Sequence, residues 1–332
     1  MVRLGVALVV VLALSATSGA QGAEPKKLTL DVTDDTLAEV VLVMSEASGV
    51  TILATDTASQ SLLSLSLPEG DVETAVQAVA QAIDGSWLRT YVIEPAGQEP
   101  PEETAADIIG RLQVAWRDWM LSRTDEELDA FRERALASMG GPPIAPQPTA
   151  GGGMMFDVVE MLQAPFHAER ISLKVEAVDV RQALGQFTLG CGYTVLLSPE
   201  VTGQVSLDAT DEELSAILDA LCEPVNAQWR PLYLIGKARE VSSTEMEQRF
   251  TQMLEQGVTE FWKQPPEDRA RIVQRIADRM ANIPPEVQTA VKNSPWTSRL
   301  MGRAMQFVFT LTPDQRREIA PILQGAVKLF GQ

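Results

Sequence analysis

Two stretches of this chain, DGSWLRTYVI at residues 84–93 and NAQWRPLYLI at residues 226–235, repeat one pattern. In each, a turn-like segment precedes a Trp, a Tyr follows four residues later, and an Ile follows after two more. Alternate residues of a strand share one face, so the Trp, Tyr and Ile of each stretch lie together. The pattern predicts the same strand twice, with its apolar face packed in a core.

The repeat extends backwards from these two strands. At an offset of 143 the range 28–58 falls on 171–201, and from residue 61 the offset is 142. Both copies show alternating strand patterns and helical stripes in the same order. The matched helix starts and stops are Thr36 with Glu39 and Gly49 in the first copy, and Asp179 with Gln182 and Gly192 in the second. The sequence therefore predicts an α+β fold with two β-α-β-β-α-β modules.

The two modules resemble a known family. The series of strand, capped helix, Gly and strand stands in LTLDVTDDTLAEVVLVMSEASGVTIL and ISLKVEAVDVRQALGQFTLGCGYTVL, and continues through LSLSLPEGDVETAVQAVAQAI and VSLDATDEELSAILDAL. Over residues 28–93 and 171–236 the chain is similar to the secretin and TonB N-terminal short domain (STN). That resemblance implies a periplasmic α+β module that makes protein–protein contacts and has no catalytic residues. It covers the modules alone, so it does not imply a full secretin or TonB-dependent receptor.

The last strand of the second module contains a proline, Pro231. Proline cannot donate a hydrogen bond to a neighbouring strand, so it favours an edge position. An exposed edge can accept a strand from a partner protein. We therefore expect a partner-binding edge strand that contains Trp229, Pro231, Tyr233 and Ile235.

The remaining segments define the organisation of the chain. Residues 1–23 have a basic start, an apolar run of about ten residues and small residues at the end. These features predict a secretory signal peptide, too short to span a bilayer and without a Cys for a lipid anchor. The expected order is signal peptide 1–23, first module 24–97, helical hairpin 98–139, Pro/Gly linker 140–153, second module with a short leading helix 154–241, and helical region 242–332. We expect a periplasmic or secreted protein with no integral membrane span after signal removal.

The helical stripes of the C-terminal region leave two interpretations open. Either they pack on the modules and on each other, or they form a groove for a partner or for self-association. The phrase LTPDQRREI, at residues 311–319, resembles the LTxxQ motif of small periplasmic chaperones. It also fits an ordinary helix start, with Thr312 and Gln315 at capping-box spacing.

The only two cysteines, Cys191 and Cys222, both lie in the second module. Their equivalents in the first module are Ser48 and Ala80, so both cysteines are present in one copy and absent from the other. An exported protein can keep a disulfide. We expect a Cys191–Cys222 bridge, with two buried apolar thiols as the alternative.

The sequence shows no pattern of catalytic or metal-binding residues. His167 is the only His, without partners at the spacing of a hydrolytic triad or a metal site, so we expect a surface or linker role. The Gly triplet at 151–153 lacks the Lys of a phosphate loop. A net charge of −18 disfavours nucleic acids and anionic lipids as partners. We expect no enzyme activity, no cofactor and no metal.

These observations favour an exported adaptor or assembly protein of the cell envelope. Its expected partner is an envelope protein, such as a secretin-like channel or a TonB-dependent receptor. The alternative is a periplasmic chaperone-like binder that uses the C-terminal helices. A third hypothesis, an enzyme with a pocket of scattered acidic residues, has the least support in the sequence.

Overall fold

The computed structural model describes residues 8–10, 27–138, 154–163, 166–283, 288–289 and 295–330. Helices and strands are mixed along these ranges, which confirms the α+β class. The predicted linker, residues 140–153, lies outside the described residues. Most of the predicted signal peptide also lies outside them. The chain forms two compact units, residues 1–146 with 155–239 and residues 147–154 with 240–332. In the described part, no helix combines the length and apolar character needed to cross a membrane.

The first unit contains two similar series of elements. We call residues 28–95 the first module and residues 170–237 the second module. The first comprises β2 (Leu28–Thr36), α1 (Leu37–Ser48), β3 (Thr51–Ala54), α2 (Asp56–Ser59), β4 (Leu62–Gly70), α3 (Val72–Ala82) and β5 (Gly85–Pro95). The second comprises β7 (Arg170–Asp179), α7 (Val180–Cys191), β8 (Val195–Leu197), β9 (Gln204–Glu213), α8 (Leu214–Cys222), the 3-10 turn η1 (Glu223–Val225) and β10 (Ala227–Lys237).

The helix boundaries follow the expected signals with one difference. Thr36 and Glu39 form a full capping box at the start of α1. At the start of α7, the Asp179 side chain accepts from the N–H of Arg181, and the Asp179 N–H does not donate to the Gln182 side chain. Both helices end as predicted, at Gly49 (φ 74°) and at Gly192 (φ 84°), where a residue without Cβ takes the left-handed conformation.

The two modules also share their strand irregularities. Asp34 in β2 and Ala177 in β7 both have positive φ, 54° and 47°, where each strand shifts register. In both, the backbone N–H donates to a serine hydroxyl on the antiparallel partner strand. The bond runs from Asp34 to Ser64 of β4 at 3.0 Å, and from Ala177 to Ser206 of β9 at 2.8 Å. The duplication is therefore visible in backbone detail as well as in the apolar pattern.

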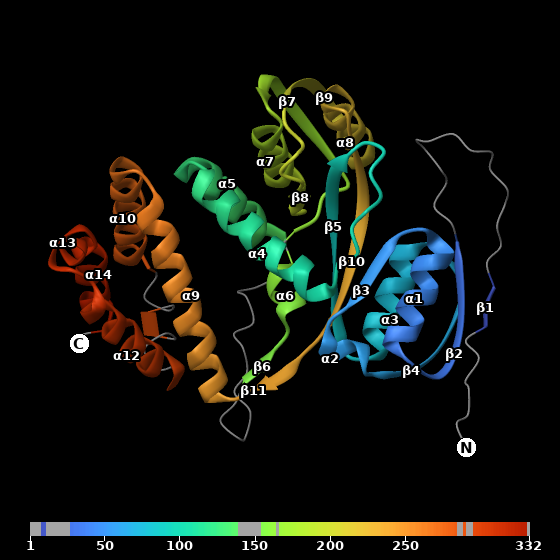
Figure 1. Cartoon of the computed structure of the whole chain (residues 1–332), viewed down its shortest axis with the longest axis horizontal. Coiled ribbons are helices and arrows are strands. Elements are labelled where there is room, and N and C mark those ends of the chain that lie inside the picture. The colour runs from blue at the N-terminus through green and yellow to red at the C-terminus, as the bar shows by residue number, and fades with distance from the viewer. Residues whose placement is uncertain are drawn as a thin grey trace. The chain divides into compact units, whose positions relative to one another are not determined.

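A four-stranded sheet, in the order β3-β10-β5-β8, joins the two modules. β5 and β10 pair antiparallel over their full length, from Ala227 opposite Pro95 to Lys237 opposite Gly85. β3 runs parallel to β10, and β8 runs parallel to β5. Each outer strand therefore pairs with the last strand of the other module, and β5 and β10 run side by side between the two sets of helices (Figure 1). β2–β4 and β7–β9 form separate antiparallel pairs, and β1 (Leu8–Val10) lies along β2.

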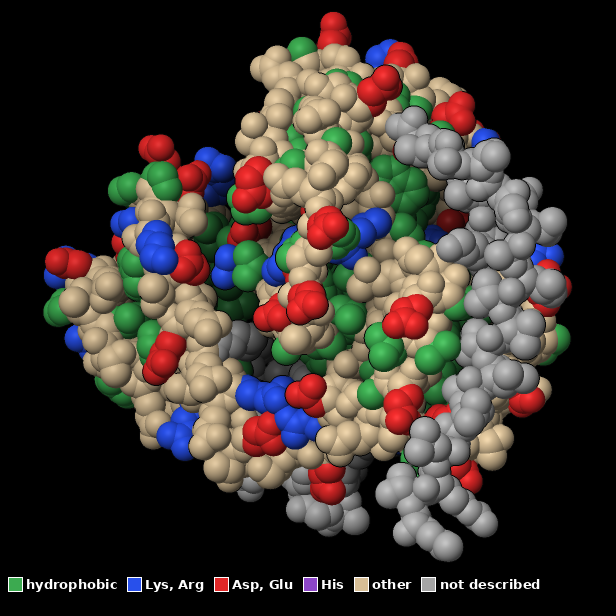
Figure 2. All heavy atoms as spheres, turned by 45° about the vertical axis from the view of Figure 1, so that its right-hand side comes forward, with side chains coloured by type: hydrophobic (Ala, Val, Ile, Leu, Met, Phe, Trp, Pro, Cys, Tyr) green, Lys and Arg blue, Asp and Glu red, His purple; other side chains and the backbone are tan. Residues whose placement is uncertain are grey.

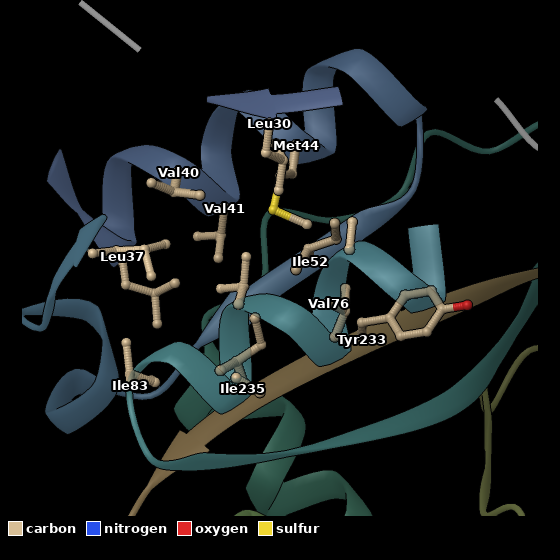
Figure 3. Packing of buried hydrophobic residues seen from close by; sticks show 14 of the residues in the cluster. Leu30, Leu37, Val40, Val41, Met44, Ile52, Val76, Ile83, Tyr233 and Ile235 are labelled. Atoms are coloured by element: carbon tan, nitrogen blue, oxygen red, sulfur yellow. The ribbon is translucent and has the colours of Figure 1, made fainter. Parts of the chain in front are cut away.

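The two hydrophobic cores exchange residues in the same way. Tyr233 and Ile235, from the second module, are buried among α1, β3 and α3 of the first (Figure 3). Tyr91 and Ile93, from the first module, are buried in the core of the second, where Tyr91 meets Phe187 edge-on at 6.1 Å between ring centroids. The repeated strand thus occurs twice because each copy completes the core of the other. The modules form one folded body.

This arrangement corrects the prediction of a free edge at Trp229–Ile235. β10 is an inner strand, with β5 along one side and β3 along the other at Leu232–Ile235. The Ile235 carbonyl accepts from the Thr55 N–H on the β3 side, so the backbone of Pro231, four residues earlier, also faces that side. The β3 pairing begins only at Leu232. The missing N–H of Pro231 therefore costs no ladder bond, although the strand lies inside the sheet.

Helices cover the second face of the four-stranded sheet. α4 (Ala105–Ser122) and α6 (Val158–Leu162) bury a third core against it. Its fully or nearly buried members are Leu88, Val92, Ala105, Ile108, Leu112, Val159, Leu196, Leu232 and Leu234. α4 continues beyond the sheet, where Trp119 donates its indole N–H to the Gly185 carbonyl of α7 at 2.9 Å. There α4 packs against α5 (Asp125–Ser138) through Trp119, Leu128 and Phe131.

The second unit is helical. It contains α9 (Ser243–Lys263), α10 (Pro266–Ala281), α12 (Pro295–Thr310), α13 (Pro313–Glu318) and α14 (Ala320–Phe330). β6 (Met154–Phe156) and β11 (Arg239–Val241) form a two-stranded sheet. α9 packs with α12 and α10 with α14, and Arg269 of α10 pairs with Glu318 at 2.6 Å. The predicted capping box of Thr312 and Gln315 is present. The helix that starts at Pro313 ends at Glu318, and α14 follows as a separate helix, because Pro321 lacks the N–H that would continue the first one.

Cys191 and Cys222 are both free thiols, and the predicted bridge is not formed. Both side chains are buried in the second core, at the ends of α7 and α8. Burial raises the pKa of each thiol to about 12. The core therefore accommodates the two sulfurs as separate, neutral, apolar groups, which is the alternative that the sequence left open.

Candidate protein-binding groove

An open groove of about 1080 Å³ lies between α4 and the second module. One wall is α4, and another is the part of α7 from Arg181 to Thr188. Thr194–Glu200, which includes β8, also lines the groove. The groove forms because α4 starts on the sheet and then leaves it to reach α7 through Trp119. Its volume lies just above the range of about 300–1,000 Å³ that is common for pockets that hold small-molecule ligands.

β8 presents unpaired backbone groups on its outer side. The Thr194 carbonyl accepts from the Tyr91 N–H, and the Ser198 N–H donates to the Ile93 carbonyl, so these residues face β5. Successive residues of a strand alternate in direction, and therefore Val195 and Leu197 turn their N–H and C=O groups away from β5. Within the described ranges, no residue pairs with those outward groups. They are free to bond an added strand.

The equivalent edge in the first module is closed. Ile52 of β3 corresponds to Val195 at the repeat offset, and its backbone likewise points away from β10. The Ser45 hydroxyl accepts from the Ile52 N–H at 3.0 Å and lies 3.2 Å from the Ile52 carbonyl oxygen. The residue at the position of Ser45 in the second module is Thr188, for which no such bond is present in the described structure. The two edges therefore differ: one is satisfied internally and the other is open.

The α4 wall of the groove is smooth and partly apolar. Ala106, Gly110 and Val114 lie at intervals of four residues, so they share one side of the helix. A Cβ added at Gly110 would meet no atom within 4 Å, and the Val114 side chain is 46% exposed. This wall offers small side chains and one accessible apolar surface to an occupant.

Most charged groups of the groove lining already have partners. The four carboxylates each have one: Glu94 with Arg230, Asp107 with Thr104, Asp118 with Arg117, and Glu200 with Ser198. Arg111 pairs with Glu103, and Arg123 pairs with Glu127. Arg181, in the first turn of α7, is the one charged lining side chain without a partner among the described residues.

An ionic network stands beside the groove. Arg230 of β10 lies 3.3 Å from Glu94 of β5 and 3.6 Å from Glu103, and donates to the Thr51 hydroxyl of β3 at 2.9 Å. The side chains of Glu94 and Glu103 are 9% and 12% exposed. Glu103 also binds Arg111 of α4. The network therefore ties the start of α4 to three strands of the four-stranded sheet.

A second polar cluster surrounds Arg89 at the middle of β5. Arg89 binds Glu73 of α3 at 2.6 Å, Glu169 at 2.6 Å, and the Tyr193 hydroxyl. Its guanidinium also lies over the Tyr193 ring, 4.3 Å from the centroid. The cavity beside it measures about 10 Å³, roughly the minimum for one water molecule. The cluster joins the two modules and has no room for a substrate.

His167 is exposed at the surface, as the sequence predicted, and it also contacts this cluster, which the sequence did not indicate. Its ring stacks on Tyr193 with 4.4 Å between centroids. Partial desolvation of the ring, followed by the charge on Arg89, lowers the pKa of His167, and Glu169 partly opposes this. His167 is therefore held neutral to a lower pH than in an unfolded chain.

We expect His167 to make stability depend on pH. The unfolded chain takes up a proton near pH 6.5 and the folded chain at lower pH. The stabilising contribution is therefore present above about pH 6.5 and is lost as the pH falls below it. His167→Phe keeps a ring for the Tyr193 stack but cannot titrate. Urea unfolding between pH 7.5 and 5 should show a smaller loss of stability in the variant, and parallel curves would contradict the assignment.

The four residues expected to bind a partner lie on the inner strand β10 and not on a free edge. Pro231 lies opposite Tyr91, and the indole N–H of Trp229 donates to Asp219 at 2.7 Å. Tyr233 and Ile235 are core residues. The groove residues Val195 and Arg181 were not identified from the sequence. Among the described residues, no group of three or more His, Cys, Asp or Glu side chains is placed to hold a metal ion.

On the face shown in Figure 2, the described residues form no large patch of a single charge. On the face shown in Figure 2, acidic and basic side chains are interspersed, with hydrophobic side chains between them. A mixed surface of this kind is typical of a soluble protein surface and does not by itself mark a ligand. The groove is distinguished by its open strand edge.

Comparison with known proteins gives no relative from which a function could be transferred. No family model, no curated protein and no solved structure matches this chain.

Proposed function

We propose that this protein is a non-enzymatic interaction protein of the cell envelope, which binds an extended segment of a partner protein. The segment adds as a strand to β8 in the groove beside α4. The observation that carries the proposal is the open edge at Val195 and Leu197, whose counterpart at Ile52 is closed by Ser45. Main-chain hydrogen bonds give affinity in this mode of recognition, and side-chain pockets give specificity.

The resemblance of the modules to the secretin and TonB N-terminal short domain supports the same class of function. That family makes protein–protein contacts in the periplasm. The predicted signal peptide supports export to that compartment. We therefore propose an envelope protein as the partner, with a secretin-like channel or a TonB-dependent receptor as the first to be tested.

The β8 edge can be tested with Val195→Pro. This change removes an N–H that faces the groove and leaves the groups that bond β5 in place. Val195→Ala is the matched control, because it removes the branched valine side chain, as Val195→Pro does, but keeps the N–H. Peptides selected from a displayed library of unstructured twelve-residue sequences serve as the probe, with affinity measured by fluorescence anisotropy.

We expect at least a tenfold loss of affinity in Val195→Pro and a small change in Val195→Ala, since each lost main-chain bond costs about 1 kcal/mol and an added proline also disrupts its neighbour. Hydrogen exchange of the complex should show protection at Val195 and Leu197. The proposal is wrong if the library yields no binder, or if both variants bind equally well. Thermal unfolding of both variants verifies that the fold is retained.

A further inference from the structure

The side chains around the β8 edge indicate what kind of segment the groove accepts. An added strand alternates its side chains between the two faces of the sheet. On one side of β8 these side chains would meet the α4 wall, with Ala106, Gly110 and Val114. On the other they would meet the α7 wall, with Arg181 and Thr188. The two sides of the occupant therefore meet different chemistry.

The α4 wall selects apolar side chains. α4 packs on the same sheet face as Leu196, and Val114 remains 46% exposed above the groove. Burying an exposed valine and its apolar contact removes hydrocarbon surface from water, which is favourable by about 25 cal/mol per Å². A polar side chain placed there would gain no hydrogen-bond partner from Ala106 or Gly110.

The α7 wall selects a negative charge. Glu94 and Asp118 of the lining pair with arginines. Asp107 and Glu200 accept hydrogen bonds from hydroxyl groups, whereas Arg181 has no partner among the described residues. An acidic side chain next to Arg181 forms a new ion pair without breaking an existing one. The net charge of −18 does not override this contact, because charges beyond about 8 Å are largely screened at physiological ionic strength.

We propose that the groove binds an extended segment in which apolar and acidic residues alternate, and that Arg181 forms ion pairs with the acidic residues. This inference rests on the proposed strand addition at β8 and specifies the chemistry of the partner. An opposite-charge pair at such a partly exposed site contributes about 1 kcal/mol, which corresponds to roughly a fivefold change in affinity.

The test uses three labelled eight-residue peptides, which alternate Val with Glu, with Gln or with Lys. Their affinities for the full-length protein are measured by fluorescence anisotropy at 0.15 M salt. We expect the Val-Glu peptide to bind about fivefold more tightly than Val-Gln, and Val-Lys to bind most weakly. Arg181→Glu should reverse this order, and Arg181→Gln should remove the difference between Glu and Gln.

The outcomes separate the two proposals. If wild type binds the three peptides equally and Val195→Pro abolishes all binding, strand addition stands and the role of Arg181 is wrong. If Val195→Pro leaves all three affinities unchanged, or if none of the peptides binds, the strand-addition site is wrong and the inference is overturned with it. Arg249→Glu, in α9 of the second unit, is a control for the change in net charge and should leave the order of the peptides unchanged.

Discussion

Ile235→Ala is expected to destabilise the first module, although Ile235 belongs by sequence to the second. The side chain is fully buried with Leu37, Met44 and Val76 (Figure 3). Removing so many buried methyl and methylene groups costs about 2–5 kcal/mol, because the lost burial is compounded by the cavity that remains. Hydrogen exchange should accelerate most in α1 and α3.

Ile93→Ala is the matched variant. Ile93 is the equivalent residue of the repeat, is also fully buried, and lies in the core of the second module. Its replacement should cost a similar amount and accelerate exchange most in α7 and α8. If each variant instead affected the helices of its own module, the exchange of strands between the cores would be disproved. Equal acceleration throughout would show that the unit unfolds only as a whole.

Arg230→Met is expected to cost about 3–5 kcal/mol, the range for removing one partner from a buried ion pair. The change leaves Glu94 without its cation, and deprives Glu103 of one of its two. Because Arg230 also binds Thr51, the variant should loosen β3 at its junction with β10. Urea unfolding monitored by tryptophan fluorescence measures the loss.

The second change Glu94→Leu should recover much of that stability, since a buried ion pair replaced by apolar groups is often neutral or better. Lys174→Met serves as the surface control. Lys174 pairs with Asp208 at 2.6 Å, but both side chains are more than 60% exposed, so its removal should leave the unfolding midpoint almost unchanged. A midpoint for Arg230→Met close to that of the control would show that the network does not hold the sheet.

Local signals in the sequence determined the elements of the two modules. The Thr36–Glu39 capping box, the glycines at 49 and 192 and the alternating strand patterns act over a few residues, and each appears where it was predicted. The 143- and 142-residue offsets showed that the modules repeat. They contained no information on which copy of the last strand completes which core, because both copies present the same apolar face.

Candidate functional residues were harder to predict, because they depend on contacts between segments that are far apart in the sequence. Arg89 and Arg230 stand as charged residues inside otherwise apolar strands, and that contrast is a sequence signal for a buried ion pair. The open edge at Val195 has no comparable signal. It depends on which backbone groups of β8 face β5, and on the absence of a bond like the one from Ser45 to Ile52.

The sequence by itself thus determined the α+β class, the duplication and the boundaries of most helices and strands, because these follow from local conformation and apolar periodicity. Only the tertiary structure decided the pairing of β5 with β10, the inner position of Pro231 and the open edge of β8. Two strands with equal apolar faces can satisfy either core. The choice between them therefore depends on long-range packing and on ion pairs such as Arg89 with Glu169 and Arg230 with Glu94, which link segments of the two modules.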